Sequence, residues 1–273
     1  MGIEQERERA RPAVDQPRGG ERGLTGRRAL VVGGSGGIGR GVAGALARRG
    51  AEIFLLGGRD EAKMEEALRE CSEFGGKAAG SLLDLEDDEA FGSAEGLESI
   101  LGPDPRFDLL VCAFGPFLQL PLAKTSPSDW RRLALLDLAL PGALASFLLP
   151  GMIGRGWGRL VFFGGTGTDT IKASRTNAAY AAAKTGLGVI AKSIALQHAA
   201  DGIASFVVCP GLVDTEYHDA ETRAALTTKA PNGRLLDPRE FGETVAALAA
   251  AEPCLVSGAV VAMDGGLELA RGP

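Results

Sequence analysis

A glycine-rich turn constrains the fold of this chain more than any other feature. It reads GGSGGIG over residues 33–39, between the apolar run 29–32 and a segment of helical composition. Glycine tolerates positive φ angles and has no Cβ to block an approaching ligand. In the order strand, turn and helix, backbone N–H groups and the positive helix end face a pyrophosphate. The turn therefore predicts a dinucleotide site that includes Gly33, Ser35, Gly37, Ile38 and Gly39.

Short apolar runs alternate with longer segments of helical composition along the whole chain. The apolar runs are residues 29–32, 53–56, 78–83, 108–114, 159–163, 205–209 and 259–263. Several are continuous, as expected for strands covered on both faces. The segments 39–49, 60–73, 87–101, 128–153, 177–200 and 238–250 are long enough for crossover helices. This order predicts an α/β fold with a doubly wound, Rossmann-like parallel sheet of about seven strands flanked by helices.

Composition limits the partners and the compartment. The net charge of −6 excludes a typical nucleic-acid surface, which needs concentrated Lys and Arg. Residues 1–22 are charged and rich in Pro and Gly, so we expect a disordered N-terminal arm before one dinucleotide-binding domain over residues 23–270. No uninterrupted apolar run reaches the roughly 18 residues of a membrane span. We expect a soluble cytoplasmic protein without a membrane partner.

The cysteines and histidines do not form a metal-ligand pattern. Four scattered cysteines contain no CxxC pair, and Cys112 and Cys209 lie inside apolar runs. We expect buried free thiols in a reducing compartment. The two histidines, His198 and His218, are isolated, so no metal site is predicted.

A residue three positions after the second apolar run indicates which nicotinamide cofactor is preferred. In a dinucleotide fold, an acidic residue about 20 positions past the glycine turn binds the ribose 2′-hydroxyl. Here Arg59 stands at this place, and a guanidinium can bind a 2′-phosphate with two hydrogen bonds. Arg40 would add positive charge, whereas Asp60 keeps NAD(H) possible. The sequence favours NADP(H).

Tyr180 and Lys184 are candidate catalytic residues. They are four positions apart, which places them on one face of a helix. A phenol with a pKa of about 10 needs its anion stabilised to act as an acid–base group at neutral pH. An ammonium group one helical turn away provides this stabilisation.

Five motifs in order resemble the short-chain dehydrogenase/reductase family over residues 24–270. They are the glycine turn, Asp84, Tyr180-xxx-Lys184, the segment 210–215 and Asp264-Gly265-Gly266. The Tyr-xxx-Lys spacing resembles the common single-domain branch and differs from the enoyl-reductase branch. The resemblance implies an oxidoreductase that transfers hydride between the nicotinamide and a carbonyl or secondary alcohol, with Tyr180 as acid/base. It also implies that Lys184 lowers the tyrosine pKa and binds the nicotinamide ribose.

The resemblance further implies cofactor contacts and an assembly. The adenine half would contact Asp84 and Leu85, and the nicotinamide half would contact Gly115, Pro210, Gly211, Val213 and Thr215. Relatives commonly form homo-dimers or homo-tetramers through the helices equivalent to residues 128–153 and 177–200. The segments 114–122, 167–176 and 213–236 would face the substrate, and the last would include a mobile lid.

The chain departs from the family pattern at three places. Cys112-Ala113-Phe114-Gly115 replaces Asn-Asn-Ala-Gly after the fourth strand. No serine stands at the catalytic position before Tyr180; we expect Thr166 to replace it, with Thr168 as the alternative. Asp137 occupies the position of a family asparagine. Its carboxylate would pair with Lys184 and raise the pKa of Tyr180, or it is simply tolerated and solvated.

These departures leave a second functional hypothesis. The chain would then be a catalytically weak NADP-binding sensor or scaffold with the same fold. The presence of Tyr180 and Lys184 argues against it, because a pure binding protein needs no phenol at this place.

Overall fold

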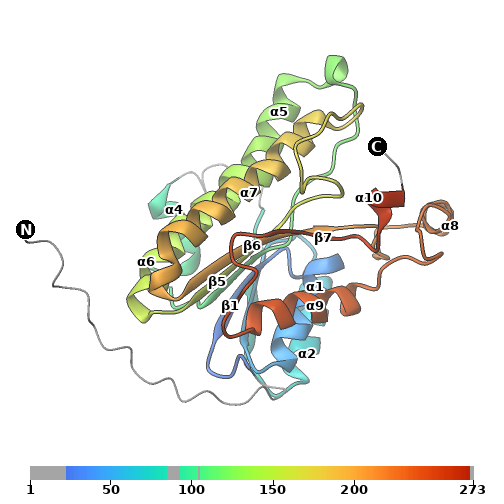
Figure 1. Ribbon diagram of the computed structural model, residues 1–273. Helices are drawn as coiled ribbons and strands as arrows, with labels where there is room; N and C mark the ends of the chain where they lie inside the picture. The colour runs from blue at the N-terminus through green and yellow to red at the C-terminus, as the bar shows by residue number, and fades with distance from the viewer. Residues whose placement is uncertain (1–22, 85–92, 104, 271–273) are drawn as a thin grey trace, which may run out of the picture.

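The computed structural model describes residues 23–84, 93–103 and 105–270. The predicted arm, residues 1–22, and the predicted adenine contact Leu85 lie outside the described residues. Seven strands form one parallel sheet in the order β3-β2-β1-β4-β5-β6-β7 (Figure 1). They are β1 (Arg28–Val32), β2 (Glu52–Leu56), β3 (Ala78–Ser81), β4 (Leu109–Cys112), β5 (Gly158–Phe163), β6 (Ile203–Pro210) and β7 (Val260–Met263).

The predicted doubly wound sheet is therefore confirmed. The strand order reverses between β1 and β4, and such a switch point opens a crevice at the carboxyl ends of the strands. The predicted apolar runs coincide with the seven strands and differ from them only at their ends.

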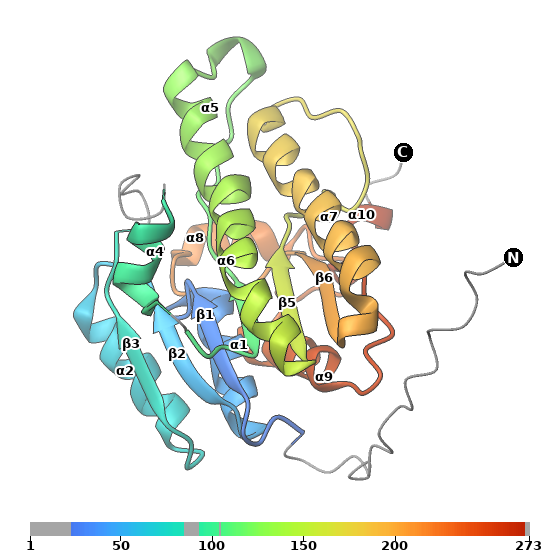
Figure 2. The ribbon, with the colours of Figure 1, turned by 90° about the vertical axis from the view of Figure 1, so that its left-hand side faces the viewer.

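Helices cover both faces of the sheet (Figures 1 and 2). One layer contains α1 (Gly37–Arg48), α2 (Glu61–Ser72) and α9 (Pro238–Ala250), and the other contains α4 (Ala94–Leu101), α6 (Leu140–Arg155) and α7 (Ala178–His198). Successive strand residues point to opposite faces. In β1, Val31 joins the core under the first layer and Leu30 joins the core under the second. Two buried faces explain why the strand sequences are continuous apolar runs.

The segment predicted as one helix over residues 128–153 is built from three parts. Helix α5 (Pro127–Ala134) starts at a capping box formed by Ser126 and Asp129, continues through the π-helical turn Leu135–Ala139, and passes into α6. By length and composition, Pro127–Arg155 is apolar enough to cross a membrane, and 44% of its most apolar window is buried inside the structure. A core helix of a globular protein has the same properties.

Short elements complete the described chain. They are the 3₁₀ turns Leu122–Lys124 and Ala199–Asp201, α8 (Ala220–Thr227) and α10 (Leu267–Ala270). Helix α8 lies in the segment 213–236, which was expected to include a mobile lid; that role stays a prediction.

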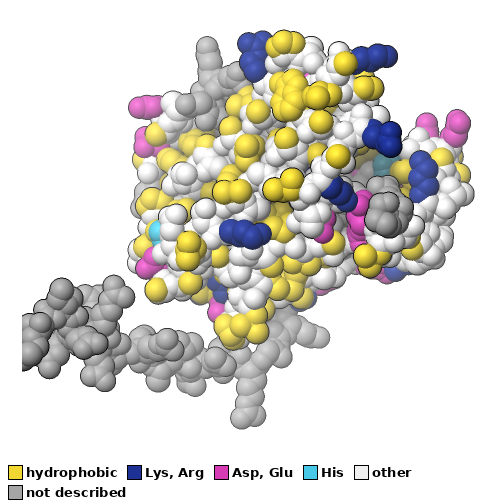
Figure 3. Space-filling model, turned by 45° about the horizontal axis from the view of Figure 1, so that its top comes forward, with side chains coloured by type: hydrophobic (Ala, Val, Ile, Leu, Met, Phe, Trp, Pro, Cys, Tyr) yellow, Lys and Arg dark blue, Asp and Glu magenta, His cyan; other side chains and the backbone are white. Residues whose placement is uncertain are grey.

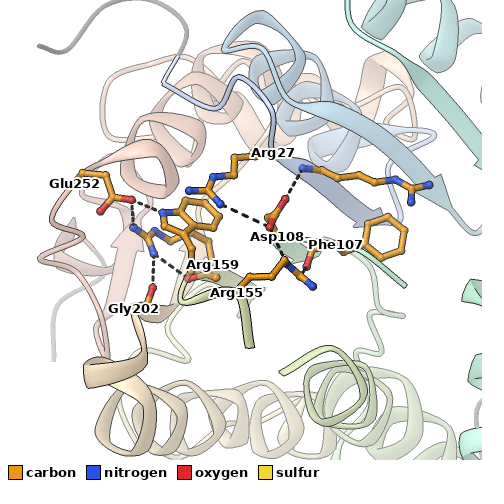
Figure 4. A network of polar contacts seen from close by, with 10 residues as sticks. Arg27, Phe107, Asp108, Arg155, Arg159, Gly202 and Glu252 are labelled. Carbon is orange, nitrogen blue, oxygen red and sulfur yellow. Dashed lines mark hydrogen bonds and ion pairs between the residues drawn. The ribbon is translucent and has the colours of Figure 1, made fainter. Parts of the chain in front are cut away.

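A buried arginine, Arg159, binds several segments at the amino-terminal ends of the strands, opposite the crevice (Figure 4). Arg159 donates hydrogen bonds to the carbonyls of Ala249, Gly158 and Gly202 at 3.2, 2.9 and 3.2 Å. It also pairs with Glu252 at 2.7 Å. Nearby, Asp108 accepts from the Arg28 N–H at 3.0 Å and pairs with Arg155 at 3.3 Å.

Candidate active site

The glycine turn lies at the carboxyl end of β1 and leads directly into α1. Gly33 has a φ of +80°, and a Cβ added there would lie 2.7 Å from the Phe114 Cβ. A Cβ on Gly39 would lie 2.2 Å from the Gly33 carbonyl oxygen. Larger residues are therefore excluded at both positions. Helix α1 has no side-chain cap at Gly36 and no acidic residue in its first turn, which suits an anionic ligand.

Arg59 lies close to the glycine turn, where the adenosine ribose of a dinucleotide would bind. It follows β2, and a Cβ on the neighbouring Gly58 would lie 2.9 Å from the Ser35 Oγ of the glycine turn. The exposed Arg59 guanidinium forms an ion pair of 2.5 Å with Asp84. Two of the residues that were predicted to bind the adenosine half are thus brought together.

Arg40 is paired with two carboxylates. Its guanidinium hydrogen-bonds Glu70 on α2 at 2.7 and 2.6 Å and Glu66 at 3.0 Å. Because these carboxylates neutralise it, Arg40 adds no unpaired positive charge beside Arg59. The structure therefore directs this guanidinium toward α2.

Tyr180 and Lys184 lie in the first turns of α7, where two other segments contact Lys184. The Lys184 Nζ donates to the Phe114 carbonyl at 3.0 Å and forms an ion pair of 3.0 Å with the Asp137 Oδ1. Both charged side chains are buried, and Asp137 lies in the π-helical turn. A Cβ on Gly115 would lie 1.8 Å from the Asp137 Oδ1. Gly115 therefore leaves the space that the ion pair fills.

Burial dominates the electrostatics of this cluster. It raises the pKa of Asp137, and the nearby Lys184 opposes this effect. The pKa of Tyr180 is raised well above its ordinary value, first by burial and then by the negative charge of Asp137. Asp137 is therefore not solvated, and its charge acts on the phenol in the direction expected from the sequence.

The phenol of Tyr180 is packed between an aromatic ring and a glycine. Its ring meets Phe117 edge-on, with centroids 5.1 Å apart and planes at 85°. A Cβ on Gly165 would lie 2.5 Å from the Tyr180 Oη. Gly165 is the second residue after β5. Sequence reasoning missed it, although counting forward from the strand rather than back from Tyr180 would have found it.

The two candidate threonines bind backbone groups. The Thr166 hydroxyl donates to the Pro210 carbonyl at 2.9 Å. The buried Thr168 hydroxyl donates to the Gly165 carbonyl at 3.0 Å and accepts from the Gly165 N–H at 2.8 Å. The role of Thr166 in place of the family serine stays a prediction.

The loop after β6 runs across the crevice toward the glycine turn. A Cβ on Gly211 would lie 2.6 Å from the Asp264 Cα, so two family motifs are in contact. Val213 is buried and pairs with Leu236. A Cβ on Gly37 would lie 3.6 Å from the Thr215 Cγ2. The segment 210–215 thus connects the surroundings of Tyr180 with the start of α1.

The thiols agree with the sequence analysis. All four cysteines are free, and Cys71, Cys112 and Cys209 are buried. Burial raises the pKa of Cys71 to about 11 and that of Cys112 to about 12, so neither is a thiolate at neutral pH. Among the residues that the structure describes, no group of three His, Cys, Asp or Glu could hold a metal ion.

A protein-family model described as enoyl-(acyl carrier protein) reductase matches residues 33–268. The chain belongs to the short-chain dehydrogenase/reductase family. A 3-oxoacyl-(acyl-carrier-protein) reductase from Haemophilus influenzae is 30% identical over 249 residues, which cover 90% of this chain and 100% of that protein. The oxidoreductase UcpA from Escherichia coli is 31% identical over 264 residues, covering 90% of this chain and 96% of that protein.

Solved structures of family members have the same fold. One from Beutenbergia cavernae, described as an NAD(P)-dependent gluconate 5-dehydrogenase with bound NADP, has a TM-score of 0.79 and 30% identity. The match covers 92% of this chain and 100% of that one. A second, described as a 2-deoxy-D-gluconate 3-dehydrogenase from Agrobacterium tumefaciens with bound NADP, has a TM-score of 0.77 and 26% identity, and covers 90% and 98% of the two chains. This short-chain dehydrogenase/reductase is therefore an NAD(P)-dependent oxidoreductase.

Proposed function

We propose that this enzyme transfers hydride between NADP(H) and a carbonyl or secondary alcohol, with Tyr180 as the acid/base group. The observation that carries the proposal is the buried cluster of Lys184, Phe114 and Asp137 beside the Tyr180 phenol. The NADP bound to two related structures and the reductase name of a relative support it. The cofactor would lie on residues 33–39, Arg59, Asp84, Gly115 and residues 210–215.

The bound nicotinamide supplies or accepts the hydride, and the side chains handle the proton. In reduction, the Tyr180 Oη donates a proton to the carbonyl oxygen of the substrate; in oxidation it accepts the hydroxyl proton. Because its pKa is raised, Tyr180 is protonated at neutral pH and can donate the proton that carbonyl reduction needs. An ammonium has three N–H donors, so Lys184 retains a donor for a ribose hydroxyl besides those used by Phe114 and Asp137.

The enzyme assay uses a panel of ketones and aldehydes with NADPH, and follows the loss of NADPH absorbance. Aliphatic 3-oxo thioesters and hydroxyketones belong in the panel because of the names that the relatives carry. Turnover of a carbonyl supports the proposal. An enoyl thioester as the only substrate would contradict it.

Replacing Arg59 with alanine should separate the two cofactors. We expect the Kd of NADPH to rise about tenfold or more, since a charge-assisted hydrogen bond is lost. The Kd of NADH should change by less than about twofold, because NADH lacks the 2′-phosphate. Lys77→Ala, which removes an exposed positive charge before β3, is the control. Equal weakening of both cofactors in calorimetry would refute the assignment of Arg59.

Replacing Asp137 with asparagine should lower the pKa of Tyr180. The negative charge of Asp137 disfavours the tyrosinate, so its removal favours that anion. Alcohol oxidation needs the deprotonated phenol. The increase of its rate with pH should therefore occur about one pH unit lower in the variant than in the unmodified chain. The distant Asp201→Asn should leave the pH–rate profile unchanged. An unmoved profile in the Asp137 variant would rule out this role of the carboxylate.

We also propose a cytoplasmic homo-dimer or homo-tetramer, with a small-molecule substrate and no nucleic-acid or membrane partner. Figure 3 shows apolar side chains over much of the helical face of the molecule. On α7, Val189 and Leu196 are 68% and 86% exposed, and a partner subunit would cover them. The four free thiols suit a reducing compartment. Light scattering measures the oligomeric state.

A further inference from the structure

A carboxylate from the loop after β6 occupies the start of α1. Both oxygens of Glu216 accept a hydrogen bond from the Gly37 N–H, Oε1 at 3.0 Å and Oε2 at 3.2 Å. The contact joins residues 179 positions apart in the chain. A Cβ on Gly36 would lie 2.6 Å from the Glu216 Oε1, so the carboxylate rests directly on the glycine turn.

The Glu216 carboxylate binds the Gly37 N–H, the group that a pyrophosphate would bind. The first N–H groups of a helix have no partner within the helix, and the positive end of the helix dipole attracts anions. Helix α1 has no side-chain cap of its own, so Glu216 takes this place from a distant part of the chain. A pyrophosphate bound here would meet a like charge at the same N–H.

The tip of the loop after β6, Glu216 and Tyr217, is held weakly, and its base near Asp214 is held firmly. The base is fixed by Asp214, which donates its N–H to the Leu236 carbonyl at 2.8 Å and pairs with Arg223 at 2.6 Å. At the tip, Glu216 is exposed, and the Tyr217 ring is 65% exposed with the Lys63 ammonium 4.7 Å from its centroid. Opening the tip breaks the Glu216–Gly37 hydrogen bonds and the contacts of Tyr217 with Lys63 and the glycine turn, and it leaves the base in place.

Space for the displaced side chain lies beside the contact. A groove of about 450 Å³ runs along α1 and is lined by Gly37, Gly41, Arg48, Glu216 and Pro238, among others. The Glu216 side chain can leave the helix end without crossing the buried core.

We propose that Glu216 is an internal competitor for the cofactor pyrophosphate. The tip of the loop, Glu216 and Tyr217, closes on the glycine turn when the cofactor is absent and moves away when it binds. Glu216 thereby lowers the affinity for the dinucleotide. The inference rests on the proposed placement of NADP(H) on residues 33–39.

Calorimetric titration of Glu216→Gln with NADPH tests this inference. We expect the Kd of NADPH to fall about fivefold, the change that corresponds to removing one charge from a helix terminus. Glu221→Gln removes the same charge five residues later, on α8, and should leave the Kd unchanged. Adenosine 2′-monophosphate has no pyrophosphate, so its affinity should be equal for the Glu216 variant and the unmodified chain.

The outcomes separate this inference from the proposed function. An unmodified chain that binds NADPH, with Glu216→Gln binding equally or more weakly, overturns the competitor role alone. If the Kd of NADPH falls equally in Glu216→Gln and Glu221→Gln, the change is a general charge effect and the competitor role is overturned. A lower Kd of adenosine 2′-monophosphate in Glu216→Gln overturns the competitor role for the same reason. If neither the unmodified chain nor Glu216→Gln binds NADPH, the cofactor placement fails and the inference fails with it.

Discussion

Replacing Tyr180 with phenylalanine is expected to lower kcat by roughly 10²–10⁴-fold, the usual contribution of a positioned acid–base group. The change removes only the hydroxyl that would exchange a proton with the substrate oxygen. The ring keeps its edge-on packing against Phe117 at 5.1 Å, so the fold and the cofactor site should be preserved. Carbonyl reduction with NADPH measures the loss.

Cofactor affinity is the control for this variant. The Kd of NADPH should change by less than about twofold, since a group acting only in the transition state does not contribute to ground-state binding. A variant that binds NADPH normally and retains most of its turnover would show that another group exchanges the proton. The sensor or scaffold hypothesis would then regain support.

Replacing Arg159 with methionine should lower the free energy of unfolding by about 3 kcal/mol. Methionine fills much of the volume but donates no hydrogen bond. The carbonyls of Ala249, Gly158 and Gly202 would lose a donor at the amino-terminal ends of the strands (Figure 4). Urea unfolding followed by circular dichroism measures the change.

Arg234→Met is the matched control for Arg159→Met. Arg234 pairs with Glu240 at 2.7 Å, but both side chains are more than half exposed, so the pair is screened by water. We expect its loss to change the free energy of unfolding by less than about 1 kcal/mol. Similar effects of the two replacements would mean that the buried network adds no more stability than a surface ion pair.

The sheet could be predicted from the sequence because each strand carries its own local signal. Strands buried on both faces read as apolar runs, and all seven were found with errors only at their ends. Helix α8 was missed because its short sequence, rich in alanine and threonine, has no buried face to create a periodic pattern. The π-helical turn at Asp137 was missed for a different reason, since it is a local detail within a long helical pattern.

The candidate site could be predicted only where a residue type implied its chemistry. Tyr180, Lys184 and the glycine turn have such signals, and the pairing of Asp137 with Lys184 followed from the resemblance. Gly165 was missed because a glycine has no functional group to suggest a role. The contact of Glu216 with Gly37 depends on how the loop after β6 folds back in three dimensions, which local sequence does not encode.

Calorimetric titration of the unmodified chain with NADPH, and separately with NADH, measures whether the chain binds a nicotinamide cofactor and which one it prefers. We expect saturable binding of NADPH and at least about tenfold weaker binding of NADH, because only NADPH offers a 2′-phosphate to Arg59. Preference for NADH would contradict the role of Arg59. Binding of neither cofactor would contradict the claim that this chain is a nicotinamide-dependent oxidoreductase.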